Sequence, residues 1–313
     1  MMRKKGIKHR VVIHNEIQAA ADLLKKKQLV AFPTETVYGL GAIIWEEEAV
    51  GQIFSVKGRP PDNPLIAHIG NLDEVHLLAK NIPPVFWKLV DRFFPGPLSI
   101  VLPKKKSVPY IATGGLDSVA IRMPSNLIAQ QLIRACGAPL VAPSANLSGK
   151  PSPVTAEQVA DDFGEKIAYI LDGGKVDYGI ESTVISLCST QGPSLLRPGN
   201  ITKEEIEAVM GTSLGSPQKE APPASPGMKY RHYAPCGKVF FFETTEELKQ
   251  HLLKNPKINR LILGDPLPLN AKTLYLSLRQ ADKQMCEEIC VYINQATRCD
   301  QALMNRLSRI ILD

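Results

Sequence analysis

Residues 31–68 read AFPTETVYGLGAIIWEEEAVGQIFSVKGRPPDNPLIAH. An apolar run over residues 29–32 stops at a proline and opens into hydroxyls and glycines, which is typical of a buried strand that delivers a polar loop to a cleft. A short amphipathic segment then ends in KGRPP, which places two cations beside a helix stop. A second apolar run covers residues 65–69. We therefore expect one pocket to collect the polar side chains of this segment, namely Thr34, Thr36, Tyr38, Lys57, Arg59, Asn63 and His68.

The composition is that of an ordinary globular protein. The chain has 313 residues, of which 44% are hydrophobic, so it can bury a sizeable core and has room for about two domains. Lysine and arginine number 37 against 31 acidic residues, which gives a formal charge of +6. This excess is compatible with a phosphate or nucleic-acid ligand, although solvated surface charge explains most of it more simply.

The cysteines and the terminal segment exclude several classes of protein. The six cysteines form no CxxC pair or disulfide framework, so we expect reduced, mostly buried thiols in a cytoplasmic protein. Cys286 and Cys290 are spaced by one helical turn, and core packing is favoured there over a metal site. No apolar run reaches the roughly 18 residues of a membrane span, and no apolar region follows the basic start, so no membrane partner is expected.

Common catalytic motifs are also missing from the sequence. It has no GxxxxGK[ST] phosphate loop and no GxGxxG after a strand. It also has no HExxH metal motif. The polar residues instead form short islands between apolar runs.

Residues 1–210 mix helical and strand patterns. Helices are expected after Asn15, over residues 73–79 and 85–94, and from Thr202, where Glu205 completes a capping box. Strands are expected over residues 29–32, 98–102, 118–122, 140–142, 167–171 and 183–187. Because helices and strands do not alternate strictly, the pattern predicts a mixed sheet in an α/β or α+β layer fold.

Composition changes after Met210. Residues 211–236 are rich in proline and poor in aliphatic residues, which indicates a linker. Its second half holds large polar and aromatic side chains, including His232 and Tyr233, so we expect it to act as a lid or binding segment. Residues 237–313 predict a small three-layer α/β domain with a parallel sheet. Its expected strands are 239–242, 260–263 and 273–276, and its expected helices are 245–253, 278–293 and 301–310.

Four cations accompany the polar islands. Lys57, Arg59, Arg122 and Arg197 lie beside hydroxyls, amides and glycines where apolar runs end. Arginine binds phosphate oxygens in a bidentate way and lysine provides a compact charge, so this composition suits a polyanion such as a nucleoside triphosphate. Surface ion pairs remain the alternative for any one of the four.

The order of these islands resembles a known family. FPTETVYGLG, KGRPPDNPL, FPGPLSIVLP, GGLDSVAIRMPS, PSANLSGKPSP, GIESTVI and LLRPG are similar to the motifs of a YrdC-type domain. HYAP and the C-terminal α/β unit are similar to the long, two-domain threonylcarbamoyl-AMP synthases. The resemblance implies a twisted mixed sheet with flanking helices, followed by a small Rossmann-like domain. It also implies an enzyme that joins L-threonine, bicarbonate and ATP and releases pyrophosphate.

The resemblance further implies a set of substrates, partners and site residues. The product would feed the threonylcarbamoyl modification of tRNA adenosine next to the anticodon, completed by a separate transferase complex, and Mg²⁺ would accompany the ATP. Lys57 and Arg59 would serve the reaction near the phosphates. The ATP contacts would be Arg59, Asn63, Ser118, Asn146, Arg197 and, closing over the nucleotide, Tyr233. The threonine and bicarbonate contacts would be Thr36, His68, Arg122, Ser144 and Ser182.

Two other functions fit parts of the pattern. YrdC-like modules also transfer carbamoyl groups from a carbamoyl-adenylate, but that setting brings zinc-finger segments and this sequence has no CxxC. A double-stranded RNA-binding or ribosome-maturation module would need many phosphate contacts, whereas a charge of +6 over 313 residues predicts weak RNA binding.

Overall fold

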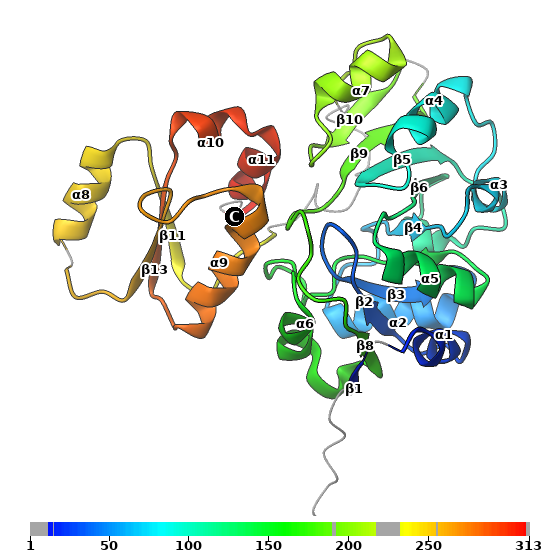
Figure 1. Ribbon diagram of the computed structural model, residues 1–313, viewed down its shortest axis with the longest axis horizontal. Coiled ribbons are helices and arrows are strands. Elements are labelled where there is room, and N and C mark those ends of the chain that lie inside the picture. The colour runs from blue at the N-terminus through cyan, green and yellow to red at the C-terminus, as the bar shows by residue number, and fades with distance from the viewer. Residues whose placement is uncertain (1–11, 15, 190–191, 217–231, 255, 311–313) are drawn as a thin grey trace, which may run out of the picture.

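The computed structural model describes residues 12–14, 16–189, 192–216, 232–254 and 256–310, and its strands form two separate sheets (Figure 1). The large sheet has ten strands in the order β1-β8-β2-β3-β7-β4-β6-β5-β9-β10. These strands are β1 (Val12–His14), β2 (Val30–Phe32), β3 (Gly39–Ile43), β4 (Ile66–His68), β5 (Leu98–Pro103), β6 (Ser118–Arg122), β7 (Leu140–Val141), β8 (Tyr169–Leu171), β9 (Thr183–Ser186) and β10 (Ser194–Arg197). The sheet contains both parallel and antiparallel pairs, which confirms the predicted mixed fold class.

Helices pack against this sheet from residues 17 to 210. They are α1 (Ile17–Lys25), α2 (Glu47–Lys57), α3 (Val75–Leu78), α4 (Pro84–Phe93), α5 (Leu127–Cys136), α6 (Ala156–Phe163) and α7 (Lys203–Met210), with the short 3₁₀ turns Leu72–Glu74, Tyr110–Thr113 and Gly164–Lys166. The expected helix over residues 73–79 is instead a 3₁₀ turn followed by the single turn α3. The capping box expected at Thr202 and Glu205 is present at the start of α7.

The end of α2 fixes the position of a cation. Ala49, Val50, Ile53 and Phe54 are buried on one face of the helix. Gly58 follows in the left-handed region at φ 61° and ends the helix, as a glycine cap does. Lys57, the last helical residue, is therefore held on the buried side of the helix rather than on an open loop.

The small sheet is entirely parallel. Its strands β11 (Lys238–Phe242), β12 (Arg260–Leu263) and β13 (Glu288–Tyr292) lie in the order β11-β13-β12. Four helices accompany them, namely α8 (Thr245–Lys254), α9 (Ala271–Lys283), α10 (Gln295–Cys299) and α11 (Gln301–Ile310). Figure 1 shows α9 and α11 on the side that faces the large sheet. A buried ion pair of 2.6 Å between Arg279 of α9 and Asp162 of α6 joins the two parts.

Two predictions for the small sheet are wrong. Residues 273–276 are not a strand, because α9 begins at the Asn270 cap and buries Leu274, Tyr275 and Leu278 at helical spacing. Residues 278–293 are not one helix, because α9 ends at Lys283 and residues 288–292 form the central strand β13. A central parallel strand is covered on both faces, so its continuous apolar run shows no alternation to distinguish it from a buried helix.

This correction also changes where two of the cysteines lie. Cys290 lies on β13 and Cys286 precedes that strand, so the two do not share a helix. All six cysteines are free thiols, but only half of them are buried, since Cys188, Cys236 and Cys299 are exposed.

The predicted linker can be compared with the structure only in part. The linker predicted over residues 211–236 falls largely on 217–231, which lie outside the described residues, and so does most of the proposed lid. Among the helices of the described ranges, none has the length and apolar character needed to cross a bilayer.

Candidate functional site

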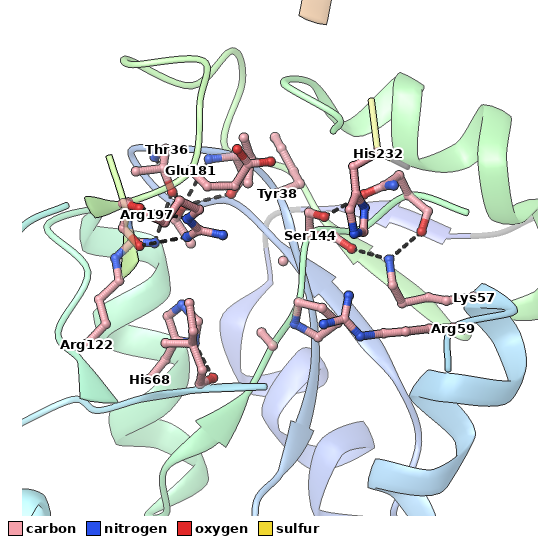
Figure 2. Close-up of a pocket in the computed structure, with 18 of the residues that line it drawn as sticks. Thr36, Tyr38, Lys57, Arg59, His68, Arg122, Ser144, Glu181, Arg197 and His232 are labelled. Carbon is pink, nitrogen blue, oxygen red and sulfur yellow. Dashed lines mark hydrogen bonds between the residues drawn. The ribbon is translucent and has the colours of Figure 1, made fainter. Parts of the chain in front are cut away.

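A cavity lies where several strands of the large sheet end (Figure 2). Its polar lining is Thr34, Thr36, Tyr38, Lys57, Arg59, His68, Arg122, Ser144, Asn146, Ser148, Glu181, Ser182, Arg197, His232 and Tyr233. Four of these side chains are lysine or arginine, and one carboxylate, Glu181, lies among the described lining residues. The cavity is therefore cationic although nearly every charge in it is buried.

Lys57 holds the turn that follows β7. Its Nζ donates to the carbonyl oxygen of Ser144 at 2.6 Å and also to that of Asn146. The turn is tightened further by a hydrogen bond of 2.6 Å from Ser144 Oγ to Asn146 Oδ1. Burial, and then the nearby charge of Arg59, hold the pKa of Lys57 well below its usual value. An anionic ligand would reverse this effect by stabilising the ammonium form.

Arg59 follows α2 and is also fixed by carbonyl oxygens. Its Nε and Nη2 donate to the carbonyl of Asn63 at 3.4 and 3.3 Å, and Nη2 donates to that of Pro64 at 3.2 Å. Burial lowers the pKa of Arg59 to about 10, so the guanidinium stays charged at neutral pH. Asn63 thus supports Arg59 through its backbone and is not among the residues that line the cavity.

A second group of polar side chains lies on the opposite side of the view in Figure 2. His68 and Arg122 are partners in the parallel pair β4 and β6. Arg122 forms an ion pair of 2.7 Å with Glu35, and its Nη1 donates to Thr36 Oγ1 at 3.0 Å. Burial, and then the charge of Arg122, lower the pKa of His68 to about 3, so the imidazole is neutral at pH 7. This group combines one oriented cation with neutral hydroxyl and imidazole groups.

A third group of polar side chains lines the cavity at the ends of β9 and β10. Arg197 donates from Nε to the carbonyl of Ser182 at 3.1 Å and from Nη2 to Ser182 Oγ at 3.3 Å. The two loops approach closely at Gly199, where an added Cβ would lie 2.6 Å from the carbonyl carbon of Ser182. Only a glycine permits this approach, which brings Arg197 against the loop that carries Ser182.

Glu181 is surrounded by donors from both parts of the chain. Its Oε1 accepts from Ser152 Oγ at 2.5 Å. Its Oε2 accepts from Tyr275 OH on α9 and from Arg306 Nε on α11, both at 2.9 Å. Burial alone would raise the pKa of Glu181, but Arg306, Arg197 and the Ser152 hydroxyl outweigh burial and lower that pKa to about 2.

This depressed pKa predicts an acid-dependent loss of stability. A carboxyl group whose pKa is lower in the folded state stabilises the protein above its unfolded pKa, here 4.5. That contribution is lost as the pH falls from 4.5 towards the folded pKa of about 2. Melting temperatures of the wild type and of Glu181→Gln should therefore differ by a constant amount between pH 7 and 5 and converge below pH 4.5. A difference that persists unchanged at pH 3 would contradict this assignment.

The structure gathers most of the predicted site residues. The residues that it brings to the cavity are Lys57, Arg59, Asn146, Arg197, Tyr233, Thr36, His68, Arg122, Ser144 and Ser182. Asn63 and Ser118 are not among the lining residues, and Ser118 instead pairs with Pro103 at the start of β6.

Two acidic residues of this site were not predicted from the sequence, and His232 was predicted only as part of the lid or binding segment. Glu35 and Glu181 bind cations around the cavity, and His232 lines it. Each of them lies within a sequence motif that could have indicated it: Glu35 in FPTET, Glu181 in GIEST and His232 in HYAP.

A mixed α/β sheet whose strand ends present buried cations with hydroxyls and amides defines a protein that binds an anionic ligand. Comparison with known proteins identifies the family. Residues 22–199 match the family model named for Sua5, YciO and YrdC, which carries the description "telomere recombination". Residues 201–309 match the threonylcarbamoyl-AMP synthase C-terminal domain. The chain belongs to the Sua5/YciO/YrdC family, in its form with this second domain, and the resemblance found in the sequence is confirmed.

Individual relatives agree with this assignment. The threonylcarbamoyl-AMP synthase of Pyrococcus abyssi is 44% identical over 94% of this chain and 93% of the relative. That of Bacillus subtilis is 49% identical over 76% of this chain and 70% of the relative. The crystal structure of Pyrococcus abyssi Sua5 complexed with L-threonine superposes with a TM-score of 0.86 at 40% identity, covering 96% of each chain.

Proposed function

We propose that the protein is an L-threonylcarbamoyladenylate synthase, a nucleotidyltransferase that converts L-threonine, bicarbonate and ATP into threonylcarbamoyl-AMP and pyrophosphate. The observation that carries the proposal is the cavity itself, in which Lys57, Arg59 and Arg197 are buried near a separate group built on Arg122, Thr36 and His68. The names of the relatives that match nearly the whole chain support the same substrates.

The reaction requires charge neutralisation more than an activated protein nucleophile. The amine of threonine adds to bicarbonate and water leaves, which gives a carbamate. A carbamate oxygen then attacks the α-phosphorus of ATP, the bond to the β-phosphate oxygen breaks, and pyrophosphate leaves. Two anions must approach one another and negative charge must move to the leaving group, so fixed cations and correct orientation supply the rate acceleration.

The two groups of cations suggest which substrate binds where. We assign the phosphates to Lys57 and Arg59, whose positions are fixed by carbonyl oxygens before any ligand arrives. We further assign Asn146 and Arg197 to the nucleotide side and propose that Tyr233, which also lines the cavity, covers it. We assign the threonine and bicarbonate side to Thr36, His68, Arg122, Ser144 and Ser182. Neutral His68 leaves Arg122 as the cation for the threonine carboxylate.

Mg²⁺ is proposed to enter with the triphosphate as part of the substrate. Glu181, the carboxylate among the described lining residues, already accepts from Ser152, Tyr275 and Arg306. The lining therefore does not fit a resident Mg²⁺ site, since that ion prefers free carboxylate and water oxygens. Phosphate oxygens and water are the expected ligands. The adenylate product would pass to a tRNA-modifying transferase complex in the cytoplasm.

The test is substrate dependence of pyrophosphate release. Full-length protein is incubated with ATP, Mg²⁺, bicarbonate and labelled threonine, and both pyrophosphate and a threonine-containing adenylate are measured. We expect both products to appear together and to require threonine. The proposal would be rejected if pyrophosphate release did not depend on threonine. Pyrophosphate release that required carbamoyl phosphate would also reject it and would favour carbamoyl transfer. RNA binding without turnover would favour the RNA-binding alternative.

A Thr36→Val variant tests which side of the cavity binds threonine. It keeps the shape of the side chain but removes the oxygen that accepts from Arg122 and that also shares a hydrogen bond with Thr34 Oγ1. Loss of one buried hydrogen bond of this kind costs about 1–3 kcal/mol, so the KM for threonine should rise about tenfold while the KM for ATP stays unchanged. Equal changes in both KM values would show that the two sides of the cavity are assigned wrongly.

A further inference from the structure

A cluster of three different metal-ligating side chains lies in the small sheet. Glu288 and Cys290 are two residues apart on the central strand β13, so their side chains point to the same face of the sheet. His251 of α8 contacts that face through Glu288. The ligand atoms of these three residues, a ring nitrogen, a carboxylate oxygen and a sulfur, all lie within 4.8 Å of one another.

The cluster belongs to the face of the small sheet that is turned away from the large sheet. Figure 1 shows α8 and α9 on opposite sides of the small sheet, with α9 on the side of the large sheet. The face under α8 has its own small core, made of Phe240, Phe242, Leu248, Leu252, Ile262, Cys290 and Tyr292. The cluster is therefore separate from the ion pairs that join the two parts of the protein.

The helix α8 has little apolar surface to hold it on the sheet. Leu248 is the only buried residue of α8, all of whose residues are described. His251 supplies the polar contact, with its Nε2 3.1 Å from Glu288 Oε2. Its ring centroid lies 4.7 and 5.1 Å from those of Phe240 and Phe242. A further bond at His251 would therefore strengthen the attachment of this helix.

The spacing of the ligand atoms suits a tetrahedral cation. Zinc binds nitrogen, oxygen and sulfur ligands at about 2.0–2.3 Å, which places two ligand atoms about 3.3–3.6 Å apart around a tetrahedron. The separation of 3.1 Å between His251 and Glu288 is already close to that spacing. Since no two of the three atoms are more than 4.8 Å apart, side-chain movements of about 1 Å complete the set.

The chemistry of the ligands selects the kind of cation. Thiolate and imidazole suit zinc, whereas magnesium and calcium prefer oxygen ligands alone. Arg260 Nη2 lies 3.2 Å from Glu288 Oε2 and holds that carboxylate in place, as the outer partners of metal ligands commonly do. The guanidinium also repels a second cation, and the two anionic ligands, carboxylate and thiolate, offset this repulsion.

We propose that His251, Glu288 and Cys290 bind a zinc ion, with water as the fourth ligand, and that the ion joins α8 to β13. Binding releases the thiol proton of Cys290 to solvent and takes the imidazole in its neutral form. The sequence did not indicate this set, because His251 lies 37 residues before Glu288. The proposal does not depend on the proposed function, since none of the three residues lines the cavity.

Cobalt is the spectroscopic probe for this site in the full-length protein. The protein is freed of metal with a chelator and titrated with Co²⁺, which gives a near-ultraviolet charge-transfer band when a thiolate binds it. We expect one equivalent of Co²⁺ to produce this band and an excess of Zn²⁺ to abolish it by displacement. A wild-type protein without the band would overturn the proposal, because no thiolate would then bind the ion.

Variants of two ligands test which side chains bind the ion. His251→Phe keeps a ring beside Phe240 and Phe242 but removes the ligand nitrogen. Cys290→Ala removes the sulfur and should abolish the band. Loss of an outer partner of a metal ligand costs about 10–100-fold in affinity, so loss of a ligand itself should weaken Co²⁺ binding at least about tenfold. Unchanged affinity in either variant would contradict the proposal.

Cys286→Ala is the matched control. Cys286 is also a buried thiol and lies shortly before β13, but its Sγ is 3.9 Å from Asn259 Oδ1 and is not part of the cluster. This variant should keep the band and bind Co²⁺ within twofold of the wild type. If it weakens binding as much as Cys290→Ala does, the thiols act without a specific site and the proposal is wrong.

Thermal unfolding covers the case in which Cys290→Ala does not fold. An ion that binds only the folded protein raises its melting temperature. Zn²⁺ should therefore raise the melting temperature of the wild type and of Cys286→Ala. His251→Phe, in which the changed side chain is 21% exposed, should show no such rise. An equal rise in His251→Phe would mean that zinc binds elsewhere and would reject the site.

Discussion

The Arg59→Ala variant should release pyrophosphate at least about a hundredfold more slowly than the wild type, since removal of one fixed donor to a developing charge costs about 10²–10³ in kcat. Arg59 is buried, is oriented by the carbonyls of Asn63 and Pro64, and keeps its charge at neutral pH. The measurement is threonine-dependent pyrophosphate release at saturating ATP and threonine. Saturation separates loss of catalysis from loss of substrate binding.

The control for this variant is Arg92→Ala. Arg92 is an exposed arginine on α4, 5.6 Å from the centroid of the Phe93 ring, and it does not line the cavity. It should turn over like the wild type. Because Arg59 is buried, the melting temperature of Arg59→Ala must be measured as well. A folded Arg59→Ala protein with more than a tenth of wild-type activity would show that Arg59 does not serve the reaction.

The Arg122→Ala variant should lose about 3–5 kcal/mol of the free energy of unfolding. Arg122 and Glu35 have side chains only 4% and 2% exposed and form an ion pair of 2.7 Å. Removing the cation leaves the Glu35 carboxylate buried without its counter-ion, and such a charge costs more than the pair contributed. Guanidinium denaturation of the two proteins gives the difference directly.

The matched control is Arg298→Ala, which breaks an ion pair of 3.1 Å with Glu243 whose side chains are 46% and 69% exposed. Water screens such exposed charges, so this variant should lose far less stability than Arg122→Ala. A second protein, Glu35→Gln/Arg122→Gln, should recover part of the loss because neither buried charge remains. Equal losses in Arg122→Ala and Arg298→Ala would contradict the burial argument.

The strands of the large sheet could be predicted better from the sequence than those of the small sheet, because of the residues that separate their apolar runs. The apolar runs at residues 29–32, 98–102, 118–122 and 183–187 are separated by prolines, glycines and polar loops, and they correspond to β2, β5, β6 and β9. Residues 273–278 read TLYLSL, where leucine and a second residue alternate as in a strand. Leucines at 274 and 278 also satisfy a helical period, and only burial against the rest of the protein decides between the two.

The sequence predicted the cationic residues of the site but not its acidic residues. Lys57, Arg59 and Arg122 stand out because each cation ends an apolar or amphipathic run. Glu35 and Glu181 give the opposite signal, since acidic residues are not expected in a site for an anion. Their meaning depends on partners distant in sequence, and Arg306 lies 125 residues after Glu181. Such pairs become visible only in the folded structure.

The dependence of Glu181 and Asp162 on Arg306 and Arg279 has a consequence for synthesis on the ribosome. Protein chains emerge from the N-terminus and tend to fold domain by domain in that order. The large sheet of this protein is made before α9 and α11 exist, so the Glu181 carboxylate must first remain hydrated, while Asp162 has Lys150 as its cation. The nascent protein therefore carries an unfinished cavity, and the wall around Glu181 reaches its final charge only when the last described helix has been translated and has docked.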